Sequence, residues 1–496
     1  MTGQLRANAP RPGLGYVLRK KLRALVEPFP WAYRFLLRLW GIVVAVRFFL
    51  HALVSGKLRA KRDDGRFAAF LSRQSVLDFN VNLGVIRDAD DLQQALAAQD
   101  LDPMAGGWTF YVRPGPALDR CFPFLREVYP AGVGLKILKD LQHPDDAIYA
   151  RHELNPAAGA SLLRKLTPPP KTLMRIANQL HAAGLGPRVH DLIHLDAAGV
   201  PLTAYVVDHV GGPLADARAH AEFMPRLESW LEGGGITTVH SSTDAAMDFE
   251  APDCNGNLRL DAKTGQPLYV DFQSFMITDD AALVGQIAEE EKDKTHFGGT
   301  RFFRGGGQYL YQAIPGLAPG KRDIETRWRA FDELLRHADL SLDGRLVFDI
   351  GCNTGLMLYQ ALGAGALWGF GWDMPEVAGA ASRLLPALGA TRATVTGGAI
   401  TDATDFAAAL PDRFGDRTGG VLFYLAVSDH IGFPPGVADL PWTYMFYEGH
   451  ADQGIGDQYQ RIKAVPWLAQ AELLGHRMIT DGDSPARPLM LIRRPS

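Results

Sequence analysis

The feature that most constrains the fold is a pattern within residues 345–373. An apolar run, Arg345–Ile350, leads into the glycine turn Gly351–Gly355, an apolar helical pattern and a second apolar run that ends in Asp373. Strand, glycine turn, helix, strand and terminal acid form the first half of a doubly wound sheet that binds a nucleotide. The pattern therefore predicts an α/β, Rossmann-like fold for this part of the chain.

The residues of this turn suit close contact with a ligand. Glycine lets the backbone approach a bound molecule without steric cost. Asn353 stands where glycine is commoner, and Asn tolerates left-handed geometry better than most residues. Asp373, at the end of the second strand, can accept hydrogen bonds from ribose hydroxyls.

Asp349, Gly351 and Gly355 form an Asp-x-Gly-x-x-x-Gly pattern that resembles the first motif of class I S-adenosylmethionine-dependent methyltransferases. The resemblance implies that S-adenosylmethionine is the cofactor. It further implies that Asp349 and the turn, Asn353 included, hold the methionine end, and that Asp373 holds the ribose. The alternative is an unrelated strand–turn–helix with chance glycines.

Later runs fit the seven-stranded sheet of that family. We expect strands at Ala393–Thr396, Gly420–Val427 and Trp442–Tyr447, an antiparallel pair at His476–Thr480 and Pro488–Arg493, and helices at Pro375–Leu388 and Leu468–Leu474. The resemblance implies an adenine contact at Asp402. That residue could equally be the N-cap of a helix over 403–410, since Asp is a preferred cap.

Two histidines are candidates for proton transfer. His430 follows the fourth predicted strand with Asp429, and His450 follows the fifth with Glu448. Ligands of open α/β sheets bind beyond the carboxyl ends of the strands. Since a hydroxyl acceptor must lose a proton, His430 or His450 is the predicted catalytic base. Helix capping and second-layer hydrogen bonding are the structural alternatives.

The segment before this domain carries a second resemblance. Tyr311–Ile314 (YQAI) and Pro319–Arg322 (PGKR) are similar to the lead-in of methyltransferases of the tRNA wobble-uridine group. Many relatives with that core modify small molecules or glycans, so the substrate stays open. The local charge is not strongly basic, which weakens the RNA interpretation.

Residues 108–275 resemble the protein-kinase and aminoglycoside-phosphotransferase fold. The resemblance implies that Lys136 binds nucleotide phosphates and that Asn257 and Asp271 hold Mg²⁺ beside ATP. His-Arg-Asp is absent at the usual spacing before Asn257, and Asp253, four residues before Asn257 where five is expected, is the candidate catalytic aspartate. No Gly-rich loop precedes Lys136, and Gln273 replaces the glycine of Asp-Phe-Gly. The lobe could therefore be a phosphotransferase or a non-catalytic binding module.

Each of these residues also has a purely structural interpretation. Lys136 could be a strand lysine whose amine reaches solvent, Asn257 a turn residue and Asp271 a cap at the end of a strand. The helix expected to match kinase helix C contains no glutamate, so Glu153, outside it, is the candidate for the ion pair with Lys136. We expect strands at Trp108–Val112, Phe124–Val128, Val133–Leu138, Asp191–Leu195 and Ala204–Asp208, and helices at Leu173–Ala183 and Ala215–Glu232.

Charge is unevenly distributed along the chain. Residues 1–62 hold thirteen Lys or Arg and one acid, for a net charge of +12, whereas the remainder carries −16. Nucleic-acid binding by global charge is therefore disfavoured. The apolar stretch 35–54 is interrupted by Arg38 and Arg47, which argues against a membrane span. We expect a helical segment that either contacts an anionic membrane surface or packs against a partner.

These observations predict a multidomain protein: the basic segment 1–62, a two-lobed α+β kinase-like domain over 63–285, a linker and lead-in over 286–330, and the methyltransferase over 331–496. Three cysteines make no disulfide framework, which fits the cytoplasm.

The domain content is similar to that of O-antigen chain-terminating kinase–methyltransferases, in the reverse order. The resemblance implies a bifunctional enzyme acting on a glycan or lipid-linked acceptor at the inner face of the membrane. The alternatives are an RNA methyltransferase, a small-molecule methyltransferase, and a scaffold with both sites inactive.

Overall fold

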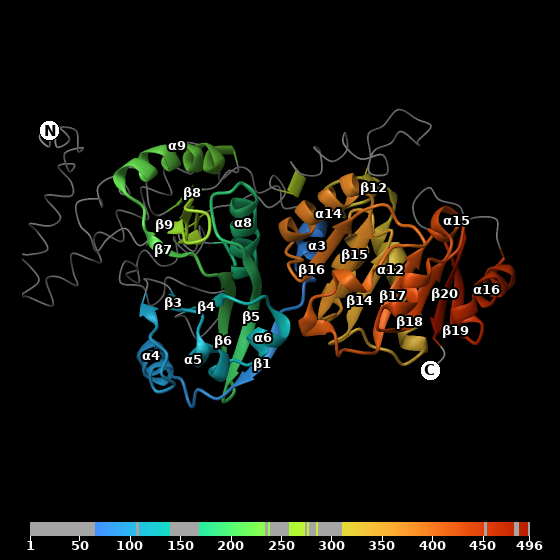
Figure 1. Ribbon diagram of the computed structural model, residues 1–496, viewed down its shortest axis with the longest axis horizontal. Helices are drawn as coiled ribbons and strands as arrows, with labels where there is room; N and C mark the ends of the chain where they lie inside the picture. The colour runs from blue at the N-terminus through green and yellow to red at the C-terminus, as the bar shows by residue number, and fades with distance from the viewer. Residues whose placement is uncertain are drawn as a thin grey trace, which may run out of the picture.

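The computed structural model describes residues 65–105, 109–138, 168–233, 237–238, 257–272, 275–276, 284–285, 310–450, 454–480 and 486–494 (Figure 1). The predictions for residues 1–62, Glu153, Asp253 and Gln273 lie outside these ranges. Among the helices that are described, none has the length and apolar character needed to cross a membrane.

The C-terminal domain is built on a seven-stranded sheet with the order β16-β15-β14-β17-β18-β20-β19. Its strands are β14 (Leu346–Ile350), β15 (Trp368–Asp373), β16 (Ala393–Gly397), β17 (Gly420–Leu425), β18 (Trp442–Glu448), β19 (Glu472–Ile479) and β20 (Arg487–Arg493). Strands β14 to β18 run parallel, whereas β20 is antiparallel to both neighbours. The predicted seven-stranded, Rossmann-like sheet is confirmed, including the terminal antiparallel pair.

The burial of the central strands explains why they can be predicted from the sequence. Every residue of β14 and β17 is buried, because strands covered on both faces read as continuous apolar runs. The helices of the domain are α12 (Ile324–His337), α13 (Leu356–Gly363), α14 (Pro375–Ala387), α15 (Ser428–Ile431) and α16 (Ile455–Lys463). Helix α14 confirms the helix predicted at 375–388, and it starts on Pro375, whose missing N–H costs nothing at that position.

Two helices expected in this domain are wrong. Residues 403–410 form only a 3₁₀ turn, Ala407–Ala409, and the side chain that accepts from its backbone is Asp405, to the Ala408 N–H at 3.0 Å. Asp402 lies in an exposed turn ahead of it and does not cap it. The helix predicted at 468–474 is not formed: a 3₁₀ helix, Pro466–Leu468, ends at the start of this range, and β19 begins within it at Glu472. Pairing of β19 with β20 overrides the local helix propensity of that segment.

The N-terminal lobe contains a six-stranded sheet with the order β1-β5-β6-β4-β3-β2. Its strands are β1 (Leu77–Val81), β2 (Met104–Ala105), β3 (Thr109–Val112), β4 (Val133–Leu138), β5 (Val189–Ala197) and β6 (Val200–Asp208). Only the β1–β5 pair is parallel. A three-stranded sheet of order β10-β9-β7 lies apart from it, with β7 (Gly211–Leu214), β9 (Leu258–Asp261) and β10 (Pro267–Tyr269).

The helices of the lobe are α4 (Ala89–Ala97), α5 (Pro116–Cys121), α6 (Phe124–Val128), α8 (Pro170–Ala182) and α9 (Ala217–Gly233). Short pairs complete the described chain: β8 (Thr237–Thr238) with β11 (Phe275–Met276), and β12 (Leu310–Gln312) with β13 (Gly320–Arg322). Most expected elements of the lobe are present. The strand predicted at 124–128 is wrong, because Phe124, Leu125 and Val128 are buried at helical spacing.

One segment contributes to both halves of the molecule. Helix α3 (Gly65–Leu71) packs Phe67 and Phe70 into the core of the methyltransferase-like sheet. The hydroxyl of Tyr359 on α13 donates to the Phe70 carbonyl at 2.6 Å. The chain then continues into β1, an edge strand of the other sheet. The predicted domain boundaries themselves stay predictions.

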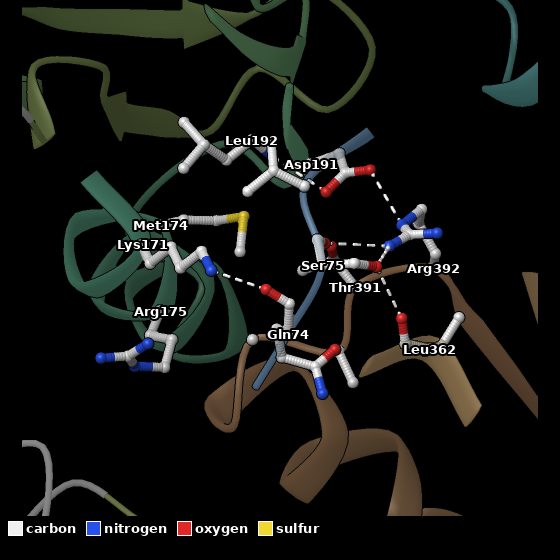
Figure 2. Close-up of a pocket in the computed structure, with 13 residues that line it drawn as sticks. Gln74, Ser75, Lys171, Met174, Arg175, Asp191, Leu192, Leu362, Thr391 and Arg392 are labelled. Atoms are coloured by element: carbon white, nitrogen blue, oxygen red, sulfur yellow. Dashed lines mark hydrogen bonds and ion pairs between the residues drawn. The ribbon is translucent and has the colours of Figure 1, made fainter. Parts of the chain in front are cut away.

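A polar contact joins the two halves where α8 meets α14 (Figure 1). Arg392, ahead of β16, pairs with Asp191 of β5 at 3.1 Å, and both side chains are almost fully buried. Asp191 also accepts from the Tyr129 hydroxyl at 2.8 Å. Figure 2 shows Arg392 reaching toward Asp191 and Ser75, with Lys171 donating to the Gln74 carbonyl nearby.

Candidate active site

The turn after β14 adopts the geometry that its sequence requires. Gly351 and Gly355 have φ of 76° and 78°, and Asn353 has φ of 52°. A Cβ on Gly351 would overlap Cγ1 of Val427, and one on Gly355 would lie 2.7 Å from Cδ1 of Leu385. The two glycines are therefore required both for backbone conformation and for space.

Asp373 at the end of β15 closes the turn from the opposite side. Its carboxylate accepts from the backbone N–H of Asn353 at 2.8 Å and of Met374 at 2.7 Å. Burial raises the pKa of Asp373, and these two hydrogen bonds oppose that shift. Since a carboxylate offers about four acceptor sites, two bonds leave capacity for ligand hydroxyls.

Asp349 is buried directly behind the turn. Only 2% of its surface is exposed, and burial raises its pKa to about 7 despite the opposing charge of Arg327. Within the described residues, Oδ1 of Asp349 and Oδ1 of Asn353 are buried without hydrogen-bond partners. Native proteins rarely leave such atoms unpaired, so a polar ligand at this turn is the simplest explanation. The residues therefore fit the methionine end of S-adenosylmethionine, which offers an ammonium donor.

Gln312 is a site residue that sequence reasoning did not single out. Its side-chain Oε1 accepts from the Thr354 hydroxyl at 2.8 Å and from the Leu356 N–H at 3.2 Å. Gln312 thereby caps the first turn of α13 and braces the glycine turn. Because more than forty residues separate it from its partners, no local cap signal marks it. The YQAI resemblance was the only indication.

The predicted acceptor edge lies beside this turn. Ile350 pairs with Tyr424 and Leu425 pairs with Glu448, so the three strands end at one level. After β17, Ala426 takes a left-handed φ of 57°, and Val427 then packs over Gly351. The segment that follows β17 is therefore adjacent to the glycine turn, and the segment that follows β18 lies one strand further along the same edge of the sheet.

The structure brings both predicted histidines to this edge. The rings of His430 and His450 are 5.5 Å apart, and Nε2 of His450 lies 3.6 Å from Oδ2 of Asp429. Burial lowers the pKa of His450, and the charge of Asp429 opposes that shift. Asp429 is also ion-paired with Arg461. His430 is exposed, whereas His450 is half-buried.

Glu448 serves a different purpose from its neighbours. It is fully buried and ion-paired with Arg322 at 2.7 Å and with Arg327 at 2.5 Å, with Arg487 at 3.6 Å. Burial alone would raise the pKa of Glu448, but the three guanidiniums lower it to about 2. Glu448 therefore ties the PGKR segment and α12 to the end of β18.

In the N-terminal lobe, three of the predicted residues come together. Lys136 on β4 is largely buried, and its Nζ donates to the carbonyl of Val270, next to Asp271. Burial lowers the pKa of Lys136 to about 8, against the charge of Asp271. The carbonyl of Asn257 accepts from the Val270 N–H at 2.8 Å.

In the described ranges, no three His, Cys, Asp or Glu side chains gather into a metal cluster. Mg²⁺ commonly binds through one or two protein oxygens plus substrate phosphates. Asp271 offers carboxylate oxygens and Asn257 an amide oxygen, which are atom types that Mg²⁺ accepts. The backbone carbonyl of Asn257 accepts from the Val270 N–H, next to Asp271 in the sequence.

Comparison with known proteins gives one sequence similarity that carries weight. No family model matches the chain. A tRNA U34 carboxymethyltransferase from Hydrogenovibrio crunogenus is 28% identical over 165 residues, which cover 31% of this chain. The chain spans 45% of the length of that relative.

One solved structure that matches is a magnesium protoporphyrin IX methyltransferase from Synechocystis with bound S-adenosylmethionine. It is 16% identical in sequence, the match covers 34% of this chain and 81% of that chain, and the TM-score is 0.26. A precorrin-6y C5,15-methyltransferase from Geobacter metallireducens is 12% identical, covers 34% and 88%, and has a TM-score of 0.24. Scores this low carry no argument about function. The sheet order, the glycine turn with its acids and this sequence similarity make the C-terminal domain similar to class I S-adenosylmethionine-dependent methyltransferases.

Proposed function

We propose that the chain transfers a methyl group from S-adenosylmethionine to an acceptor bound at the carboxyl edge of β17 and β18. The observation that carries this is the pair of buried oxygens without hydrogen-bond partners, on Asp349 and Asn353, at the glycine turn after β14. Asp349 and Asn353 receive the methionine end, Asp373 the ribose, and Asp402 the adenine.

The residues at the edge then support proton removal. S-adenosylmethionine supplies an electrophilic methyl group when bound. His450, whose Nε2 lies 3.6 Å from Oδ2 of Asp429, is the candidate base that takes the acceptor's hydroxyl proton as the acceptor oxygen becomes nucleophilic. Burial lowers the pKa of His450 below its ordinary value, so the imidazole is neutral and basic near pH 7. His430, more exposed, is the second candidate for this role.

The acceptor has two candidate classes. The similarity to an enzyme named for tRNA supports an RNA acceptor. The charge of residues 1–62 supports a glycan or lipid-linked acceptor at an anionic inner membrane face, in the cytoplasm. Incubating the chain with radiolabelled S-adenosylmethionine and either total tRNA or lipid-linked glycan extract separates the two. Transfer to tRNA that falls steeply with salt would favour RNA.

The cofactor assignment is tested by calorimetric titration with S-adenosylhomocysteine. Asp373→Ala should weaken binding at least about tenfold, because it removes the ribose acceptor (tenfold is about 1.4 kcal/mol). Asp416→Ala, which removes an exposed acid of the same domain, is the matched control and should bind like the wild type. Unchanged affinity in Asp373→Ala, with circular dichroism intact, would refute the site.

A second function rests on the N-terminal lobe. We propose that Lys136, Asn257 and Asp271 bind Mg²⁺ and ATP, with Asp253 as the candidate catalytic aspartate. A buried lysine beside a carboxylate is the supporting observation. Lys136→Met and Asp271→Asn should each abolish magnesium-dependent ATP binding, measured by calorimetry. If the intact chain binds no ATP, the lobe is not a nucleotide site.

A further inference from the structure

A tyrosine lies between the two sheets of the N-terminal lobe, next to Lys136. Tyr111 of β3 is paired directly with Lys136 of β4, and directly paired residues of antiparallel strands project from the same face of the sheet. Nζ of Lys136 donates to the Val270 carbonyl, so this face of the six-stranded sheet is turned toward the segment after β10. Tyr111 therefore shares with Lys136 the space between the two sheets.

The ring of Tyr111 covers a glycine of the neighbouring strand. A Cβ placed on Gly134 of β4 would lie 2.8 Å from both Cε2 and Oη of Tyr111, so glycine at this position leaves room for the ring. Gly134 is buried and pairs with Val207 of β6. Glycine inside a strand weakens the strand, and it often marks a place that another group approaches closely. Here the approaching group is the tyrosine ring.

The hydroxyl of Tyr111 ties the ring to the segment that connects the two sheets. This segment runs from the end of β6 to β7, and Oη of Tyr111 lies 2.6 Å from Nδ1 of His209 within it. Burial raises the pKa of Tyr111, and burial together with the charges of Arg113 and Arg259 lowers the pKa of His209. A protonated hydroxyl therefore donates to a neutral imidazole near pH 7.

The position of Tyr111 matters for a nucleotide held by Lys136. On one side of Lys136 the space is closed, because Leu138 of β4 is buried in one core cluster with side chains of α8. On the other side the space leads along β4 to the connecting segment, and there the ring of Tyr111 packs against the same cluster. A nucleotide with its phosphates at Lys136 and Asp271 needs room for its base, and the direction left to the base is the one that Tyr111 fills.

We propose that Tyr111 is a gate in the nucleotide site of this lobe. Its ring fills the base end of the site, and ATP enters after the hydrogen bond to His209 breaks and the ring turns away. The inference rests on the proposed function of Lys136, Asn257 and Asp271, and it adds a regulation of that site. Because only the open conformation binds the base, the fraction of open molecules sets the apparent affinity for ATP.

Calorimetric titration of the full chain with Mg-ATP tests the gate. Tyr111→Phe, which removes only the hydroxyl, should bind Mg-ATP about twofold to tenfold more tightly than the wild type, because the hydrogen bond that holds the gate closed is lost. Tyr111→Ala, which removes the ring, should bind at least as tightly as Tyr111→Phe. Phe110→Leu is the matched control, since Phe110 is the next residue of β3, projects from the opposite face and belongs to another core cluster. It should leave the affinity unchanged.

A second measurement follows the hydrogen bond itself. In the full chain with isotope-labelled histidine, NMR reports the Nδ1 signal of His209, which His209→Gln assigns. Saturating Mg-ATP should move this signal in the wild type toward its position in Tyr111→Phe. Unchanged or weaker ATP binding in both Tyr111 variants, or a His209 signal that keeps its position when ATP binds, would overturn the gate. Absence of ATP binding in the wild type and in both variants would instead defeat the proposed nucleotide site.

Discussion

At the scale of single residues, the glycine turn Gly351–Gly355 and the strand before it place the polar side chains of Asp349 and Asn353 in the protein interior. Asp349 lies on a strand whose residues are all buried, and among the described residues Arg327 supplies the opposite charge that lowers its pKa. A hydrophobic replacement would suit the strand better, since burying an unpaired polar group costs free energy. In the proposed function, the ammonium group of the bound ligand would offset this cost.

This placement predicts a pH-dependent stability. Burial raises the folded-state pKa of Asp349 to about 7, whereas the unfolded chain loses this proton near 3.8. Between those values the folded state binds more protons, so the contribution of Asp349 to stability falls as pH rises and levels off above 7. Asp349→Asn should therefore be more stable than the wild type at pH 8 and similar at pH 4, by urea denaturation.

The same variant should lose affinity for S-adenosylhomocysteine, because the neutral amide no longer attracts an ammonium. If Asp349→Asn destabilises the chain at pH 8, the buried carboxylate is not the strained group described here. If it gains stability and keeps the affinity, Asp349 is not a ligand contact.

At the scale of elements, the start of α13 depends on a residue from outside the sheet. Gln312 is 3% exposed, and its Oε1 accepts hydrogen bonds from the Thr354 hydroxyl and the Leu356 N–H. The Leu356 N–H belongs to the first turn of α13, where backbone N–H groups have no partner within the helix. The lead-in strand β12 thereby stabilises the helix that follows the cofactor turn. Folding of the lead-in and order in the turn are linked through one amide.

Gln312→Ala should lower the free energy of unfolding by about 1–3 kcal/mol, because two buried polar groups lose their partner. It should also weaken S-adenosylhomocysteine binding, since the turn loses its brace. Gln460→Ala, at an exposed position of α16, is the control and should change neither quantity. Chemical denaturation and calorimetry measure the two effects. Equal behaviour of both variants would contradict the bracing role.

At the scale of the whole molecule, a buried ion pair joins the two sheets. Arg392 is held by the carbonyls of Ala366 at 2.6 Å and Leu367 at 3.1 Å, and its Nε pairs with Asp191. Burial raises the pKa of Asp191, and Arg392 opposes that shift. The backbone just ahead of β15, the strand that ends in Asp373, is thus hydrogen-bonded to an arginine that is ion-paired with the other lobe's sheet.

Removing one partner of such a pair should cost more than removing both. Arg392→Met should lower the free energy of unfolding by about 3–5 kcal/mol, because it leaves Asp191 charged and buried. The double variant Arg392→Met with Asp191→Asn should recover a substantial part of that loss. Differential scanning calorimetry of the two single variants and the double variant measures the coupling. Strictly additive losses would show that the pair does not join the sheets.

Much of the methyltransferase domain was predictable because its signals are local. Asp349, the glycine turn and Asp373 lie within 25 residues, and buried parallel strands show as apolar runs. Predictions failed where pairing at a distance decided the outcome. Residues 472–474 have helical propensity, yet they join β20, and residues 124–128 are a helix although their composition suits a strand.

The sequence by itself determined the chemistry of the cofactor turn, since glycine, asparagine and acid at fixed spacing are dictated by backbone geometry and ligand charge. Only the tertiary structure decided that Gln312 caps α13 and that Glu448 forms buried ion pairs with arginines. It also decided that His450, rather than His430, lies within ion-pair distance of Asp429. The physical reason is range: backbone conformation depends on neighbouring residues, whereas hydrogen bonds and charge pairs depend on which distant segments the packed core brings together.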